Sequence, residues 1–367
     1  MTCTQDKIRG SLLGGAAGDA LGYPVEFMSL REIQSRYGSA GITAYALDRK
    51  ASTAIVSDDT QMTMFTAAGI LAGETARIGA ERPVSVEGAV REAYFDWLDT
   101  QEPGVDAKRG TWLSGIPALY ALRAPGNTCL SALRSRKRGT TEQPINGSKG
   151  CGGIMRVAPV GLYYNRGGKN IEAVDRLAAE AAAITHGHPL GWLSAAAFAH
   201  IVNRAVYGGC AFGDTLCDFV HESEDTLRRL WPGVPELQEM TAGMEAALSL
   251  ADGARTDVEN IAALGEGWVA EEALYIALYC AARYKSDFSG ALTAAVNHKG
   301  DSDSTGAITG NIVGALLGYE AIPARWKEGL ELREELLRLA DDLSAAWPMT
   351  ADFVGRTPGW RERYGGK

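Results

Sequence analysis

Apolar residues recur at spacings of three and four along most of the chain, which is the period of a helix that buries one face. On this basis helices are predicted over residues 6–21, 60–71, 86–98, 177–185, 193–206, 222–229, 236–245, 271–284, 307–318 and 324–346. Segment 271–284 is apolar nearly all round, which predicts a core helix. Only residues 42–46 suggest a brief strand, and no repeat of fixed period or alternation of strands and helices is present. The predicted class is therefore all-α.

Two long segments lack this periodicity. Residues 123–150 are rich in glycine, proline, polar and charged residues and predict a long surface loop. Loops of this length inside compact domains are usually functional or mobile. The tail after residue 347 also looks irregular, and Pro189 is expected to separate the helices on either side of it.

Composition narrows the classes of partner. The net charge of −9 and the pI near 5.2 argue against a nucleic-acid-coating surface. No window is apolar for long enough to span a bilayer, and the N-terminus lacks the features of a signal peptide. The six cysteines form no C-x-x-C pair, which fits a reducing compartment. We expect a soluble cytoplasmic protein with neither membrane nor nucleic acid as a partner.

Two clusters of carboxylates and hydroxyls stand directly before predicted helices, and they comprise Ser57, Asp58 and Asp59, and Asp301, Asp303 and Ser304. Oxygen donors without sulfur or nitrogen select Mg²⁺, Mn²⁺ or Ca²⁺ over zinc. Helix capping explains the first cluster equally well. Capping explains the second less well, because one cap does not need two carboxylates. Only tertiary folding could join the clusters in one metal site.

Other polar features have two interpretations each. The glycine-rich turn 150–153 could cradle a phosphate or could be a structural turn. His186 and His188 beside Pro189 could contact a pocket or lie at the surface. His298 is interpreted either as a residue that supports the acidic cluster from behind or as a plain loop residue, and not as a ligand. Asp19 is an anomalous charge within the small-residue helix 6–21. Trp112 and Trp268 are predicted to be core aromatics, and the basic run 134–138 a solvated loop.

Together these motifs resemble the ADP-ribosylglycohydrolase family. The matching segments are 14–22 with Glu26, 57–60, 150–156, 185–186 and 300–306, in the family's order, and they cover the chain from about residue 7 to 320. The resemblance implies a compact, single-domain, orthogonal multi-helix bundle over residues 1–367, with its core at about 7–346 and an irregular tail at 347–367. It also implies two Mg²⁺ ions, replaceable by Mn²⁺, at the base of an ADP-ribose cleft.

The resemblance further assigns roles by motif position. The implied metal ligands are Ser57, Asp58, Asp59, Asp301, Asp303 and Ser304. The implied catalytic residues are Glu26, Asp59 and Asp303. The implied substrate-binding residues are Ser148, Lys149, Gly150, Cys151, Gly152, Gly153 and His186. Some members carry Asn at the position of Cys151, and the sequence around Cys151 is similar to that of the arginine-type members.

The implied activity is Mg²⁺-dependent hydrolysis of the glycosidic bond between ADP-ribose and a modified acceptor, with arginine on a protein as the favoured acceptor. We hypothesise that a metal-activated water attacks and that Asp59 or Glu26 handles the proton. Serine, a nucleic-acid base or O-acetyl-ADP-ribose remain alternative acceptors. A second hypothesis is a binding or immunity protein that docks on an ADP-ribosyltransferase or toxin through the loop 123–149. A third is a phosphohydrolase that cleaves the diphosphate.

Overall fold

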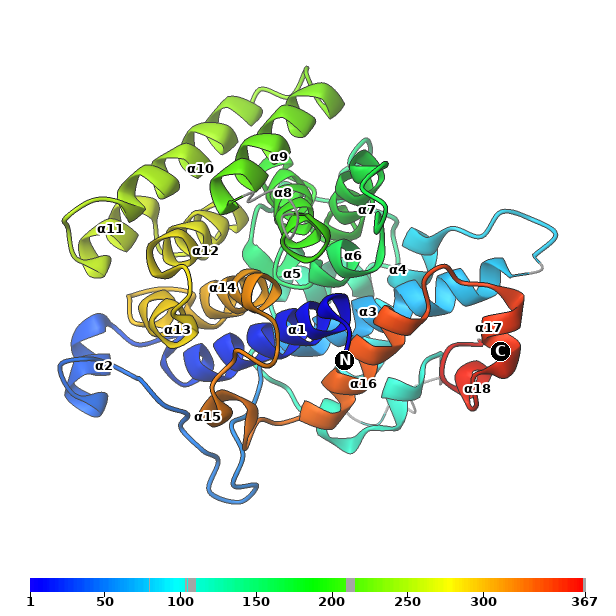
Figure 1. Ribbon diagram of the computed structural model, residues 1–367, viewed down its shortest axis with the longest axis horizontal. Helices are drawn as coiled ribbons and strands as arrows, with labels where there is room; N and C mark the ends of the chain where they lie inside the picture. Colours follow the sequence, from blue (N-terminus) through cyan, green and yellow to red (C-terminus); the bar gives the residue numbers. More distant parts are fainter. Residues whose placement is uncertain (79, 103, 105–109, 209–214, 366–367) are drawn as a thin grey trace.

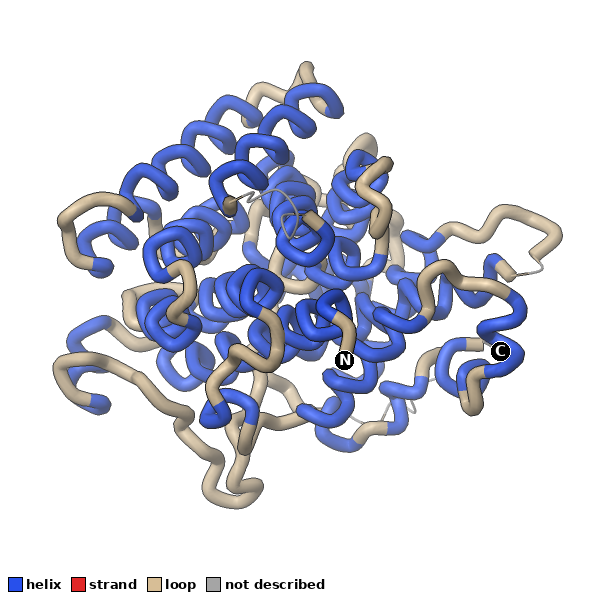
Figure 2. Tube along the Cα trace, in the orientation of Figure 1, coloured by secondary structure: helices blue, strands red, loops and turns tan. Residues whose placement is uncertain are grey.

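Helices form the regular structure of this protein, as the all-α prediction required. The computed structural model describes residues 1–367 except 79, 103, 105–109, 209–214 and 366–367. Figures 1 and 2 show the described residues as helices and loops. Within the described residues, β-type pairing is limited to two isolated bridges, Ala54 with Leu330 and Gly150 with Val269. The strand predicted at 42–46 is wrong. The side chain of Asn297 instead hydrogen-bonds both the N–H and the C=O of Ile42, at 2.8 and 2.9 Å.

Helices α1 (Cys3–Gly22) and α14 (Ser302–Leu317) lie side by side at the centre of the molecule (Figure 1). Glycines four residues apart face one another along both helices; they are Gly10, Gly14 and Gly18 on α1 and Gly306, Gly310 and Gly314 on α14. A Cβ atom built on Gly18 would lie 1.9 Å from the carbonyl oxygen of Gly306. The two backbones are thus in direct contact, and no larger residue fits between them.

The other helices surround this pair (Figure 1). Those in the first half of the chain are α2 (Leu30–Tyr37), α3 (Asp58–Arg77), α4 (Val86–Gln101), α5 (Asn127–Arg134), α6 (Ala158–Tyr163), α7 (Ile171–Ala183) and α8 (Pro189–Tyr207). Those in the second half are α9 (Leu216–Leu230), α10 (Leu237–Ala251), α11 (Asp257–Leu264), α12 (Ala270–Tyr284), α13 (Phe288–Val296), α15 (Ala324–Lys327), α16 (Arg333–Ala345), α17 (Ala351–Arg356) and α18 (Trp360–Tyr364). Four short 3₁₀ helices are η1 (Tyr23–Val25), η2 (Trp112–Gly115), η3 (Pro117–Leu119) and η4 (Cys151–Gly153).

Two predicted segments need correction, and a third prediction is confirmed in a different form. The helix predicted over 324–346 is two helices, because Leu332 adopts a left-handed φ of 58° and the connecting backbone pairs with Ala54 instead. The loop predicted over 123–150 contains α5. Pro189 does separate α7 from α8, but as the first residue of α8, where its missing N–H costs no hydrogen bond.

The tail is also more regular than predicted, since it folds into α17 and α18. Trp360 and Tyr364 are buried, and the indole N–H of Trp360 donates to Thr75 Oγ1 at 2.9 Å. Their burial against α3 explains why two such short helices form here, since tertiary packing supplies the stability that propensity lacks.

Helix α12 is largely buried, as predicted from its apolar sequence. It packs against other helices, chiefly α10 and α14. Among the helices that the structure describes, none combines the length and the apolar character needed to cross a bilayer.

Candidate metal centre and cleft

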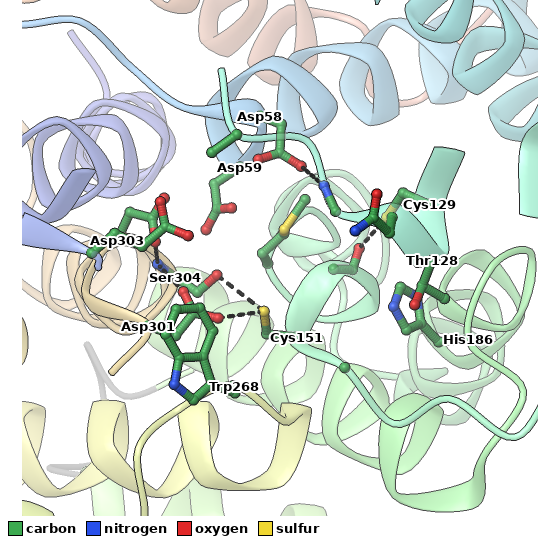
Figure 3. A pocket seen from close by; sticks show the side chains of 17 residues that line it. Asp58, Asp59, Thr128, Cys129, Cys151, His186, Trp268, Asp301, Asp303 and Ser304 are labelled. Atoms are coloured by element: carbon green, nitrogen blue, oxygen red, sulfur yellow. Dashed lines mark hydrogen bonds between the residues drawn. The ribbon is translucent and has the colours of Figure 1, made fainter. Parts of the chain in front are cut away.

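The two acidic clusters meet at the N-termini of α3 and α14. Ser57 caps α3, where its hydroxyl accepts from the backbone N–H of Asp59 at 3.2 Å. Asp301 caps α14 by accepting from the backbone N–H of Ser304 at 3.3 Å. Both capping interpretations are therefore correct, but they leave other carboxylate oxygens pointing into a shared pocket (Figure 3). The positive ends of two helix dipoles also favour negative charge here.

Three carboxylates converge closely in this pocket. Glu26, Asp301 and Asp303 each offer an oxygen atom, and these atoms lie within 4.8 Å of one another. Asp58 and Asp59 line the same pocket, and all five side chains are buried. Among the described residues, Glu26 Oε2 and Asp59 Oδ2 are buried without a hydrogen-bond partner. Buried carboxylates of this kind need either a proton or a cation.

The electrostatics of the cluster agree with this requirement. Burial, and then the charge of Asp303, raise the pKa values of Asp58, Asp59 and Asp301 well above their usual range. The same two causes, with further carboxylates, raise the pKa of Glu26 to about 10. A divalent cation would relieve this repulsion, and an all-oxygen donor set suits a hard ion such as Mg²⁺. The residues present therefore fit a metal centre.

Asp19 fixes the start of α3, beside the first acidic cluster, a role that sequence reasoning did not assign. It is fully buried on α1, and its carboxylate accepts from the backbone N–H groups of Ser57, at 3.0 Å, and Thr60, at 3.1 Å. The Thr60 hydroxyl also donates to it. Burial, and then Asp303, raise its pKa to about 7. The signal in the sequence was a single carboxylate within a helix of small residues.

The glycine-rich turn forms the opposite wall, together with His186 (Figure 3). Cβ atoms added to Gly150 and Gly152 would lie 3.3 Å from Nε2 and 3.0 Å from Cε1 of His186. The glycines thus allow the turn to lie against the imidazole ring. The turn opens only a three-residue 3₁₀ helix, so no helix dipole faces a phosphate here. Gly153 faces Ala182, away from the pocket lining.

Three further predicted residues lie just outside the pocket lining. Ser57 is buried behind Asp58 and Asp59. Ser148 lies behind the turn, where its hydroxyl accepts from the Gly150 N–H at 3.3 Å. The Lys149 ammonium forms an ion pair with Glu271 on α12. The charge of Lys149 is thus engaged within the protein.

Cys151 reaches from the glycine turn to the acidic cluster. Its Sγ lies 2.6 Å from Asp301 Oδ2 and 3.4 Å from Ser304 Oγ (Figure 3). Burial, and then the charges of Asp301 and Asp59, raise the pKa of this thiol. It therefore stays protonated and donates to Asp301. The thiol supplies one hydrogen bond at this position.

Sequence reasoning missed part of the pocket lining. Trp268 was predicted to be a core aromatic, which is wrong: it is 39% exposed, lines the pocket and stacks on Phe27 with ring centroids 5.8 Å apart. Residues of the loop 123–150 also line the pocket, among them Ala124, Gly126, Asn127, Thr128 and Cys129. In the sequence, only the length of the loop 123–150 indicated that it could line a functional site.

The remaining polar candidates lie outside the pocket lining. His188 caps α8 by accepting from the Leu190 N–H at 3.2 Å. His298 Nε2 lies 3.0 Å from Thr305 Oγ1, behind the acidic cluster as interpreted. In the basic run, Arg134 and Arg138 form ion pairs with Glu102 and Glu87 and are largely exposed.

Comparisons with known proteins agree with this site. The family model described as ADP-ribosylglycohydrolase matches residues 2–352. An uncharacterized protein of Archaeoglobus fulgidus is 32% identical over 92% of this chain and 96% of its own. The ADP-ribosyl-[dinitrogen reductase] glycohydrolase of Rhodospirillum rubrum is 25% identical over 93% and 96%, and the ADP-ribosylhydrolase ARH3 of Bos taurus is 26% identical over 92% of each chain.

A solved structure titled ADP-ribosylglycohydrolase-related protein complex has the same fold, with a TM-score of 0.59 at 24% identity over 93% of this chain and 97% of that one. The match of the family model extends from α1 to α17 and includes both acidic clusters, the glycine turn and His186. The chain therefore belongs to the ADP-ribosylglycohydrolase family and is an enzyme that hydrolyses ADP-ribose linkages.

Proposed function

We propose that this enzyme uses Mg²⁺ to hydrolyse the N-glycosidic bond between ADP-ribose and an arginine side chain on a protein. The observation that carries the proposal is the convergence of five buried carboxylates in one cleft, two of them with an oxygen that has no partner among the described residues. Such a cluster repels the diphosphate of ADP-ribose unless cations neutralise it.

The residues that would hold two such ions are Ser57, Asp58, Asp59, Asp301, Asp303 and Ser304. The capping contacts of Ser57 and Asp301 support this set, because they fix both clusters relative to their helices. When bound, the cations supply charge neutralisation and Lewis acidity toward the ribose hydroxyls and a water molecule. Mn²⁺ has similar ligand preferences and is expected to substitute for Mg²⁺.

The chain's own carboxylates manage the proton and the developing charge. Cleavage at the anomeric carbon passes through an oxocarbenium-like state, whose positive charge nearby carboxylates stabilise. Glu26 and Asp59 are the candidates for proton transfer during attack of a water molecule. Glu26 lies beside Asp301 and Asp303, and its buried Oε2 has no hydrogen-bond partner among the described residues, which supports Glu26 as the group that carries the proton.

The opposite wall suits the ADP-ribose moiety. Gly150, Cys151 and Gly152 let substrate approach the backbone closely, and His186 lies beside them. Ser148, Lys149 and Gly153 would support this wall from behind. The ion pair of Lys149 with Glu271 and the hydrogen bond of Ser148 with Gly150 are consistent with that role.

The mouth of the cleft supports arginine as the acceptor. An arginine guanidinium is a planar cation, and it is attracted both to carboxylates and to aromatic faces. The cleft contributes buried carboxylates, while Phe27 and Trp268 contribute stacked rings at the surface. The Rhodospirillum rubrum relative is named for an ADP-ribosylated protein substrate, dinitrogen reductase.

The proposal is tested by offering arginine-, serine- and nucleobase-linked ADP-ribose and O-acetyl-ADP-ribose in parallel, with Mg²⁺ or with chelator, and identifying products by mass. We expect intact ADP-ribose from the arginine conjugate with Mg²⁺ only. Preference for another conjugate would refute the acceptor, and AMP would indicate a phosphohydrolase. No release from any conjugate would favour a protein that binds an ADP-ribosyltransferase or toxin. Asp303→Ala should abolish release, while Asp225→Asn, an exposed control, should not.

A further inference from the structure

A buried arginine lies behind His186. Arg156 follows the glycine turn and is fully buried. Its Nη2 donates to the Ala181 carbonyl oxygen at 3.1 Å and to Thr185 Oγ1 at 2.7 Å, and its guanidinium lies 4.2 Å from the centroid of the Tyr94 ring. All of these partners are neutral. A buried cation held in this way is costly, which suggests that its charge serves another purpose.

The contacts of Arg156 determine the direction of the next hydrogen bond. An arginine can only donate, so Thr185 Oγ1 accepts from it. Thr185 Oγ1 also lies 2.8 Å from His186 Nδ1. The hydroxyl has a single proton to donate, and Nδ1 is the stronger of the two acceptors near it among the described residues, so we expect the proton to point to Nδ1. The Cys129 thiol also lies near Thr185, but sulfur is the weaker acceptor.

The charge of Arg156 favours the same arrangement. A guanidinium on the Nδ1 side of the ring stabilises a lone pair there and disfavours an N–H group. Burial, and then the charge of Arg156, lower the pKa of His186 to about 3, so the ring is neutral at physiological pH. A neutral imidazole carries one proton, which leaves it on Nε2. That atom faces Gly150 on the pocket wall.

We propose that Arg156 and Thr185 are positioning residues that lock His186 in the Nε2–H tautomer, so that it presents a permanent hydrogen-bond donor to an oxygen atom of ADP-ribose. This rests on the proposed function in one respect, that His186 contacts the ADP-ribose moiety. The tautomer itself follows from contacts within the protein. Tautomer and ligand contact can therefore be tested separately.

The first test is spectroscopic and needs no substrate. Protein labelled with ¹⁵N-histidine is studied by long-range ¹H–¹⁵N correlation at pH 7, and His186 is assigned among the five histidines through His186→Gln. We expect a protonated Nε2 and an unprotonated Nδ1. A protonated Nδ1 in the natural protein overturns the proposal. Thr185→Val should make the Nδ1–H form detectable and Thr185→Ser should not; an unchanged Thr185→Val spectrum overturns the relay through the hydroxyl.

The second test measures binding of ADP-ribose by calorimetry, with Mg²⁺ present, and is independent of the acceptor. Losing one well-aligned hydrogen bond should raise Kd about tenfold in Thr185→Val. Thr185→Ser should restore it. Unchanged binding in Thr185→Val, in protein whose melting temperature matches the natural one, overturns the ligand contact. If Kd rises only in the variant that loses the Nε2–H tautomer, while the enzyme hydrolyses no conjugate, the proposed activity is refuted and this inference stands.

Discussion

Replacing Glu26 with Gln should stabilise the metal-free enzyme while impairing its activity. Burial and neighbouring carboxylates raise the pKa of Glu26 from 4.5 to about 10 in the folded state. The folded protein therefore binds more protons than the unfolded chain between these values, so this group's contribution to stability falls as pH rises through that window. Because the folded state holds Glu26 protonated, taking up that proton on folding costs up to about 0.7 kcal/mol at pH 5 and about 3 kcal/mol at pH 7, at 1.36 kcal/mol per pH unit above 4.5.

Gln keeps the shape of Glu26 without its charge, so the variant should escape that cost. The assay is urea unfolding in chelator at pH 5, 7 and 8, with Glu239→Gln as an exposed control on α10. We expect the stability advantage of Glu26→Gln to grow with pH by about 1 to 3 kcal/mol, because neighbouring aspartates share part of the proton uptake. Adding Mg²⁺ should shrink it. An advantage that is absent, or constant with pH, would refute the reasoning.

Three further predictions concern other parts of the structure. Gly18→Ala should lower the free energy of unfolding by about 3 kcal/mol or more, because the added Cβ would lie 1.9 Å from the Gly306 carbonyl oxygen. The control is Gly115→Ala, whose Cβ meets nothing within 4 Å, and equal urea midpoints for the two variants would contradict the packing argument. Asp19→Asn should weaken Mg²⁺ binding about tenfold in calorimetry, because it loosens the start of α3; unchanged affinity would remove Asp19 from the support of the site. Trp268→Ala should raise KM for an ADP-ribosyl-arginine peptide about tenfold and change kcat little, whereas Trp347→Ala, at a similarly exposed tryptophan, should change neither constant. An unaltered KM in Trp268→Ala would exclude the Phe27–Trp268 pair from acceptor binding.

Local patterns predicted the helices well where burial and period agreed. Segment 271–284 had an apolar surface all round, and α12 is buried as expected. The acidic clusters could also be recognised in the sequence. Each stands where a helix cap is expected, and each has two carboxylates, which is more than a cap needs. The sequence could not show that they meet, since that depends on the glycine contacts between α1 and α14.

The errors share a physical cause, which is tertiary contact overriding local preference. The backbone around Leu332 leaves the helical path because it pairs with Ala54, a partner almost 280 positions away. The sequence around Trp268 gives no sign that the ring is exposed, yet the ring stacks on Phe27 at the cleft. The tail is helical because Trp360 is buried and its indole N–H donates to Thr75 Oγ1 on α3. None of these partners can be identified from the neighbouring sequence.

The glycine contact between α1 and α14 gives the candidate metal centre an unusual mechanical property. A joint made of side chains can absorb a disturbance by changing rotamers, whereas backbone against backbone has no such freedom. Gly10 lies twelve residues from Gly22, about 18 Å along the helix. We therefore expect a displacement at that remote end to move Asp301 and Asp303 at the other, because neither backbone can absorb it. Variants that tune or disable this enzyme should therefore be sought along the whole joint, far from any atom that touches substrate.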